Sequence, residues 1–211
     1  MTLRTVRHTG PTRSARLSAA RFLTRLAAVA ALGGAAVVAA QAAPVNYQVD
    51  PTHTFATFGV RHFGTSTMRG RFDKTEGSVM LDLAAKKGSA DITIAIDSVS
   101  TGVAELDGHL KKDDFFNTGK YPTARFVSSA FVFAGAKPTA VTGQLTMLGQ
   151  THPVKLKVTN FRCYDNPMVK KEVCGGDLEA TIKRSVWGMT SNAPFVGDDI
   201  QLSIQVEAVR Q

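Results

Sequence analysis

Apolar and polar residues alternate along most of the chain from residue 77 onward. Ile92, Ile94 and Ile96, for example, occupy every second position of one short segment. A period of two is typical of a β-strand with one buried face. The pattern predicts six such strands, whose buried positions are Val79, Leu81 and Leu83; Ile92, Ile94 and Ile96; Val141, Leu145 and Met147; Val154, Leu156 and Val158; Leu178, Ala180 and Ile182; and Ile200, Leu202, Ile204 and Val206. We expect further strands at 45–49, 53–62, 67–73 and 124–133.

Short links such as Leu148–Thr151 favour antiparallel neighbours. The sequence contains one convincing helix, in which Val103, Leu106 and Leu110 follow an expected N-cap at Thr101. Eight or more strands with little helix predict an all-β fold, either a barrel or a sandwich. The buried positions of the six strands contain no aromatic residue, which favours a barrel with room for a small ligand, although a dry sandwich core fits the same pattern.

The first 42 residues differ in composition from the rest of the chain. They contain six arginines, no acidic residue and an apolar stretch, Leu26–Ala40, which is followed by the small residue Ala42. This order is typical of a signal peptide, and the stretch is shorter than the roughly 20 residues that span a bilayer. We therefore predict a cleaved signal peptide at 1–42 and one exported domain at 43–211, located in the periplasm.

The net charge of the chain comes mainly from this leader. The whole sequence has a formal charge of +8, whereas the residues after Ala42 contain 19 basic and 17 acidic side chains, a net charge of +2. Proteins that bind nucleic acids usually concentrate basic residues on one face. We expect no nucleic-acid partner.

The two cysteines of the chain, Cys163 and Cys174, flank a segment that contains Tyr, Asp, Asn, Pro and Gly. In an exported protein such a pair favours a disulfide, here expected across a loop between two strands. A metal site needs more ligands, and the sequence shows no second cysteine pair and no regularly spaced histidines. We predict no metal site and no cofactor.

Catalytic motifs are absent from the sequence. Four histidines follow the leader, and there is no Gly-x-Ser-x-Gly or His-Glu-x-x-His pattern. His53 and His109 lie near Asp50 and Asp107 in sequence, which suits structural carboxylate–imidazole pairs. We predict no catalytic residues.

Several segments of the chain carry a resemblance to a known family. Residues 47–62, which contain Asp50-Pro51-Thr52-His53, resemble the opening of the YceI-like family of lipocalin-like, polyisoprenoid-binding proteins. The segments that match in the family's order are Met68–Phe72, Ile96–Gly102, Asp107–Phe116, Lys120–Phe126, Val141–Gly149 and Arg184–Met189. The resemblance covers nearly all of residues 45–208. It implies an extended eight-stranded antiparallel barrel with a short helix, which encloses an isoprenoid or another long-chain amphiphilic lipid such as a quinone.

The expected ligand-binding residues lie in the barrel lumen or at its mouth. Phe115 and Phe116 form either an entrance flap that contacts the lipid or a plug that seals one end. The complete set is Phe58, Val60, Ile94, Phe115, Phe116, Leu145, Leu156, Trp187 and Ile204.

The leading hypothesis is a non-enzymatic carrier, store or scavenger of such a lipid. The alternative is a small exported enzyme that acts on a lipid-like substrate through histidines at the barrel mouth. Transient contact with membranes and a homodimer are both left open.

Overall fold

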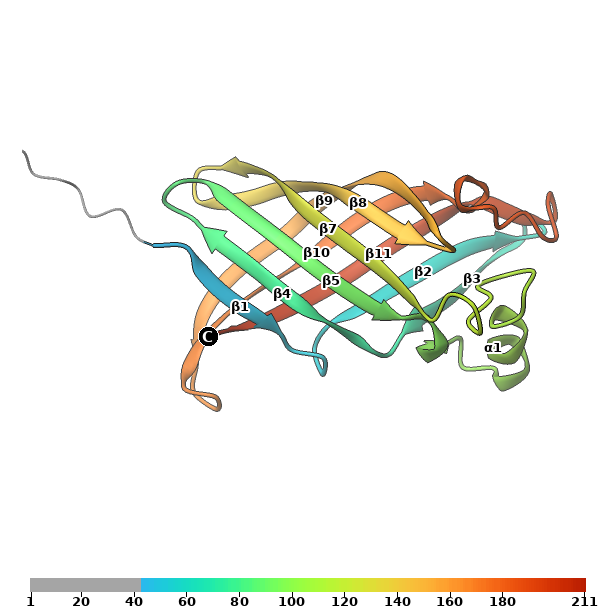
Figure 1. Cartoon of the computed structure of the whole chain (residues 1–211), viewed down its shortest axis with the longest axis horizontal. Coiled ribbons are helices and arrows are strands. Elements are labelled where there is room, and N and C mark those ends of the chain that lie inside the picture. The colour runs from blue at the N-terminus through green and yellow to red at the C-terminus, as the bar shows by residue number, and fades with distance from the viewer. Residues whose placement is uncertain (1–42) are drawn as a thin grey trace, which may run out of the picture. The chain divides into compact units, whose positions relative to one another are not determined.

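Residues 43–211, described by a computed structural model, form an antiparallel β-barrel with one short α-helix (Figure 1). The predicted signal peptide at 1–42 lies outside the described residues. The strands are β1 (Val45–Val49), β2 (Phe55–His62), β3 (Ser66–Phe72), β4 (Thr75–Asp82), β5 (Lys87–Ala95), β6 (Val99–Ser100), β7 (Thr123–Ala134), β8 (Lys137–Met147), β9 (Gln150–Asn166), β10 (Lys171–Lys183) and β11 (Val196–Arg210). The helix is α1 (Ala104–Leu110), and two short 3₁₀ helices span Ile96–Ser98 and Arg184–Trp187.

Eight strands close the barrel, in the order β1, β4, β5, β7, β8, β9, β10 and β11, because β11 pairs back to β1. The long β11 has two partners, since its residues Ala208–Arg210 pair with β1 and its residues 196–205 pair with β2. Strands β3 and β6 continue the wall from β2. Every pairing is antiparallel, as the short links predict, and the eight-stranded barrel is confirmed.

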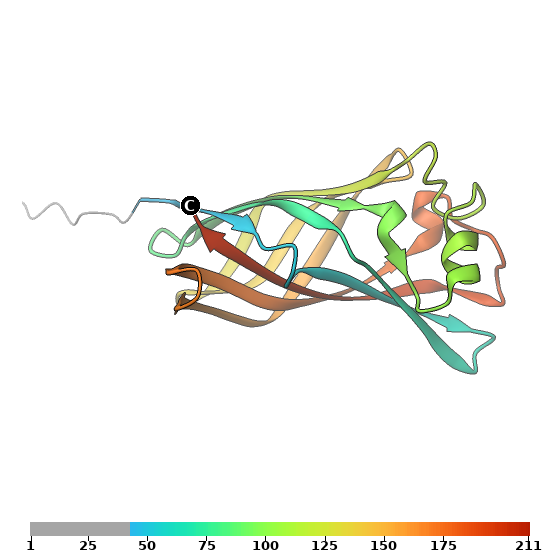
Figure 2. The ribbon, with the colours of Figure 1, turned by 90° about the horizontal axis from the view of Figure 1, so that it is seen from below.

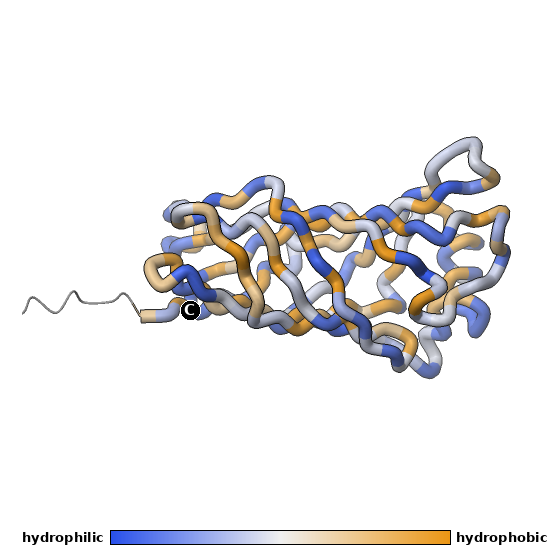
Figure 3. The backbone as a smooth tube through the Cα atoms, turned by 90° about the horizontal axis from the view of Figure 1, so that it is seen from above, coloured by the Kyte–Doolittle hydropathy of each residue, from blue (hydrophilic) through white to orange (hydrophobic). Residues whose placement is uncertain are grey.

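The alternation of residues along the strands fixes which side chains face inward. Figure 3 shows hydrophobic and hydrophilic residues taking turns along the backbone. In the pairing of β10 with β11, Leu178 lies opposite Ile204 and Ala180 lies opposite Leu202, so that apolar residues share one face. A register shift of one residue would turn this set outward, and burial therefore holds the register.

The link between β8 and β9 is a tight hairpin turn. Its two residues, Leu148 and Gly149, both have positive φ, 53° and 74°. Two residues with positive φ are typical of a type I′ turn, whose twist matches that of the flanking strands.

Two local expectations are wrong. The segment around the cysteines is not a loop, because β9 and β10 continue through it and Cys163 pairs directly with Cys174 across the ladder. The N-cap of α1 is Val103 and not Thr101. Thr101 instead donates from its backbone N and from Oγ1 to Asp107 Oδ1, each at 2.7 Å, and so fixes the approach to the helix.

The helix lies at one end of the barrel (Figures 1 and 2). There, Leu110 and Phe116 pack against a buried cluster of Ala56, Phe72, Ile96, Val99 and Ala124. In the part of the chain that the structure describes, no helix has the length and apolar character needed to cross a bilayer.

Candidate functional site

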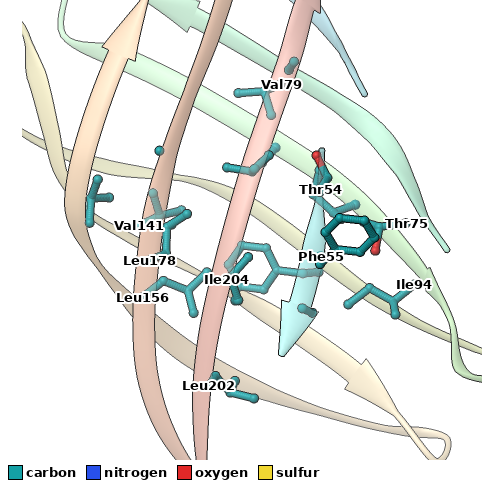
Figure 4. A pocket seen from close by; sticks show the side chains of 18 of the residues that line it. Thr54, Phe55, Thr75, Val79, Ile94, Val141, Leu156, Leu178, Leu202 and Ile204 are labelled. Carbon is teal, nitrogen blue, oxygen red and sulfur yellow. The ribbon is translucent and has the colours of Figure 1, made fainter. Parts of the chain in front are cut away.

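An apolar cavity of about 210 Å³ lies inside the barrel (Figure 4). Strands from all around the barrel contribute to its wall through their inward positions. The aliphatic residues of the wall include Val79, Leu81, Ile92, Ile94, Val141, Leu145, Val154, Leu156, Val158, Leu178, Ile182, Leu202, Ile204 and Val206. Such a wall suits a hydrocarbon chain, because burying each methylene contributes about 0.8 kcal/mol.

The cavity wall carries no charge at neutral pH. Apart from the disulfide-bonded Cys174, Tyr47 is the only lining residue among 43–211 that can ionise. Its hydroxyl donates to Glu172 Oε1 at 2.6 Å. Burial, together with this hydrogen bond and the charge of Glu172, raises the pKa of Tyr47 to about 12. The part of a ligand that enters the cavity is therefore expected to be uncharged.

Two threonine hydroxyls interrupt the hydrocarbon wall (Figure 4). Thr54 Oγ1 donates to the carbonyl oxygen of Glu207 and accepts from its backbone N, both at 3.1 Å. Thr75 is 4% exposed, and its Oγ1 has no hydrogen-bond partner among the described residues. A buried hydroxyl without a partner costs about 1–3 kcal/mol. Thr75 thus brings to the cavity wall a buried hydroxyl that no described residue pairs.

Four of the predicted site residues line this cavity: Ile94, Leu145, Leu156 and Ile204. They come from four different strands, β5, β8, β9 and β11, and the closed barrel directs them to one space. Their inward direction follows from the alternation alone.

Three predicted aromatic residues pack at the α1 end and do not line the cavity. The Phe58 ring covers Gly70, where an added Cβ atom would lie 2.5 Å from Phe58 Cζ. The ring of Phe116 packs edge-on against Phe58 and Phe72, with centroids 6.5 and 5.5 Å apart. Phe115 is buried and packs edge-on against His109, 4.8 Å between centroids. Phe116 therefore packs against the buried cluster at the α1 end.

The remaining two predicted residues also lie outside the cavity. Trp187 is only 2% exposed, donates from Nε1 to the Leu145 carbonyl oxygen at 3.2 Å and packs edge-on against His152. Val60 lies in β2 between Met68 of β3 and Ile200 of β11. Trp187 packs in the same buried cluster as the cavity-lining residues Val154 and Leu156.

The lumen contains aromatic rings that the sequence reasoning missed. We expected an interior free of bulky rings, and this is wrong, because Tyr47, Phe55, Phe72, Phe126, Phe131 and Phe161 all line the cavity. Phe126 and Phe131 belong to the expected strand at 124–133, and a register shift between Ser128 and Ala130 hides their common inward direction. These rings help to explain why the cavity is narrow.

Comparison with known proteins identifies the family. Residues 47–208 match the family model described as "YceI-like domain". The chain belongs to the YceI-like family. A UPF0312 protein of Pseudomonas paraeruginosa is 36% identical to this YceI-like chain over 195 residues, which are 90% of this chain and 100% of the relative. A UPF0312 protein of Pectobacterium atrosepticum is 35% identical over 194 residues, 90% of this chain and 98% of the relative.

Solved structures show the same fold as this YceI-like chain. The Campylobacter jejuni YceI protein superposes with a TM-score of 0.62 at 30% identity, covering 72% of this chain and 90% of that chain. Burkholderia cenocepacia BcnA gives 0.60 at 28% identity, covering 76% and 99%. A domain from Saccharophagus degradans, described as polyisoprenoid binding, gives 0.58 at 15% identity, covering 79% and 99%, and this likeness shows the fold alone.

The four histidines between residues 43 and 211 of the YceI-like chain each contact a different residue, and none of them lines the cavity. His53 Nδ1 lies 2.8 Å from Asp50 Oδ2, which confirms one of the two expected pairs and raises the pKa of the exposed His53. The pair expected between His109 and Asp107 is wrong, because Asp107 bonds to Thr101 and His109 packs on Phe115. The described residues contain no group of three or more His, Cys, Asp or Glu side chains that could hold a metal ion.

Proposed function

We propose that this protein binds an amphiphilic lipid whose apolar tail occupies the barrel cavity, and that it does so without catalysing a reaction. The observation that carries this proposal is the uncharged, hydrocarbon-lined cavity inside a closed barrel. Apolar tails are driven into such a space by the loss of water-exposed surface. Only the surplus over the cost of ordering the ligand is measured as affinity.

The ligand class that we propose is an isoprenoid or another long-chain lipid with an oxygen function, such as a quinone. The description of the Saccharophagus degradans domain as polyisoprenoid binding supports the proposal that the ligand has an isoprenoid tail. The unpartnered Thr75 hydroxyl supports an oxygen atom near the tail, because that oxygen would supply the missing hydrogen bond. A plain hydrocarbon would leave the hydroxyl unpaired.

The size of the cavity bears on the length of the tail. Pockets for drug-sized ligands measure about 300–1,000 Å³, and this cavity, at about 210 Å³, is smaller. A long isoprenoid therefore requires the lining side chains to move, or leaves part of its length outside the barrel.

We place this function in the periplasm, after removal of residues 1–42. The composition of the leader and the Cys163–Cys174 disulfide support the proposal, since disulfides persist in oxidising compartments. Mass spectrometry of the exported protein should give an N-terminus near Ala43. An intact N-terminus in the exported fraction would contradict the proposal.

The enzymatic alternative gains no support from the lumen cavity, whose wall has no nucleophile beside a base. The only hydroxyls of Thr or Ser in its wall belong to Thr54 and Thr75, and no histidine lines the cavity within residues 43–211. Nucleophilic catalysis requires such a base within hydrogen-bonding reach.

An organic extract of the purified protein tests the proposal. We expect mass spectrometry to find a stoichiometric long-chain lipid, and the extracted protein to bind added geranylgeraniol saturably. A protein that contains no lipid and binds neither geranylgeraniol nor a short-chain ubiquinone would overturn the proposal. A tightly bound transition metal in the purified protein would favour the enzyme instead.

A further inference from the structure

Two phenylalanine rings project into solvent at the α1 end of the barrel. Phe63, in the turn between β2 and β3, is 59% exposed, and Phe195, just before β11, is 57% exposed. The rings are stacked, with centroids 5.1 Å apart, and the Phe63 backbone N donates to the Phe195 carbonyl oxygen at 2.7 Å. We call these two residues the aromatic tip.

The aromatic tip is held in place although its rings are not buried. The hydrogen bond between the two backbones and the pairing of Val196 with His62 join the hairpin to the loop. Figure 2 shows the β2–β3 hairpin extending beyond the neighbouring strands at this end. Exposed apolar groups on a projecting, fixed support are typical of sites that contact proteins or membranes.

Basic side chains lie on both strands of the hairpin that carries Phe63, and the nearest carboxylates after Phe195, Asp198 and Asp199, lie beside Lys183. Residues 51–72 and 184–197 contain no Asp or Glu. Arg61 Nη2 donates to the Gly64 carbonyl oxygen at 2.8 Å, which places its guanidinium against the turn. Within the described residues, neither Arg61 nor Arg69 forms an ion pair, whereas Arg71 is paired with Asp73. Both arginines retain donors for phosphate oxygens.

We propose that the aromatic tip docks the protein on an anionic lipid bilayer. Phe63 and Phe195 enter the interfacial region, and Arg61 and Arg69 face lipid phosphates. A projecting pair of rings with adjacent arginines fits a bilayer interface, which combines an apolar interior with negative headgroups. The proposal does not depend on what the cavity holds.

Vesicle flotation tests this docking. We expect the protein to float with vesicles of equal parts phosphatidylcholine and phosphatidylglycerol at low salt, and to bind phosphatidylcholine vesicles more weakly. Replacing both rings, Phe63→Ser with Phe195→Ser, should lower vesicle affinity by about tenfold or more. Replacing both arginines, Arg61→Gln with Arg69→Gln, should remove the preference for anionic vesicles.

The matched control lies in the turn between β9 and β10, at the opposite end of the barrel, where Met168 and Val169 are also exposed. The double variant Met168→Ser with Val169→Ser should bind vesicles within about twofold of the unaltered protein. All variants share the same leader or lose it alike, so differences between them report on the tip. Absence of vesicle binding, or binding that both ring replacements leave unchanged, would overturn the proposal. If the unaltered protein captures an acidic protein but does not bind vesicles, the bilayer is also rejected as the partner.

Discussion

The two ends of the barrel are held together by different interactions. At the α1 end, Phe58, Phe72 and Phe116 pack on one another, and Trp187 is buried nearby. At the opposite end, the Cys163–Cys174 disulfide joins β9 to β10, and Tyr47 on β1 bonds to Glu172 on β10. We expect removal of side-chain volume at the α1 end to lower the free energy of unfolding. At the opposite end, we expect reductant and alkaline pH to lower it. The cavity lies between the end with packed aromatic rings and the end with the disulfide.

The largest effect is expected from Trp187, at the packed end. Trp187→Ala removes a side chain that is 2% exposed and its hydrogen bond to Leu145. We expect a loss of about 3–5 kcal/mol in the free energy of unfolding, measured by urea denaturation. Trp187→Phe keeps most of the volume and should recover most of this loss. An alanine variant as stable as the unaltered protein would show that the α1 end does not depend on packing.

A smaller effect is expected from the disulfide at the other end. The double variant Cys163→Ser with Cys174→Ser should lose about 2–3 kcal/mol, because the cross-link no longer restricts the unfolded chain. Adding reductant should reproduce this loss in the unaltered protein and leave the double variant unchanged. Two titratable thiols in the native exported protein would show instead that the bond is not formed.

Thr75, which lines the cavity between the two ends, is expected to affect both the stability of the protein and its binding of oxygen-containing ligands. Thr75→Val removes the unpartnered hydroxyl with little change of shape, and should raise the melting temperature of the ligand-free protein by the equivalent of about 1 kcal/mol. It should also weaken binding of a short-chain ubiquinone by about threefold to tenfold.

The hydrocarbon squalene serves as the control ligand for Thr75→Val, and its binding should not weaken. Thr57→Val, at a position of β2 that does not line the cavity, serves as the control variant. If Thr75→Val weakens both ligands equally, the hydroxyl does not bond to the ligand.

A further effect, confined to alkaline pH, is expected from Tyr47. Its pKa is about 12 in the folded protein and near 10 when unfolded, so the unfolded state releases the proton first. The stabilisation from neutral Tyr47 is complete below pH 10 and is lost as pH rises toward about 12. The difference in unfolding free energy between the unaltered protein and Tyr47→Phe should narrow across this range. A constant difference would contradict the assigned pKa.

The contrast between the regular strands and the α1 end explains which positions could be predicted from the sequence. Along the regular strands, Ile94, Leu145, Leu156 and Ile204 line the cavity, because a period of two fixes the inward direction of each side chain. At the α1 end, the positions of Phe58 and Trp187 depend on which distant residues they meet, such as Gly70 and Leu145. No local pattern contains that information.

Two missed features have identifiable reasons. The inward series Val79 and Leu81 extends back by steps of two to Thr75, so the hydroxyl could have been placed in the lumen by the same alternation. The segment between the cysteines contains residues typical of turns, yet the ladder from β9 to β10 and β11 keeps most of it extended. Long-range pairing overrides local preference there.

The substitution Leu156→Trp tests most directly whether the cavity is the binding site. Leu156 is 7% exposed and lines the cavity, while the neighbouring Lys155 is exposed and provides the control Lys155→Gln. If the space belongs to a ligand, Leu156→Trp should change the unfolding free energy by less than about 1 kcal/mol and exclude the longest bound tails. If the interior is a dry core, the substitution should cost about 1–3 kcal/mol and leave the lipid content unchanged. Melting temperature and the chain length of bound lipid, measured on both variants, distinguish these results, and the second would contradict lipid binding in the barrel.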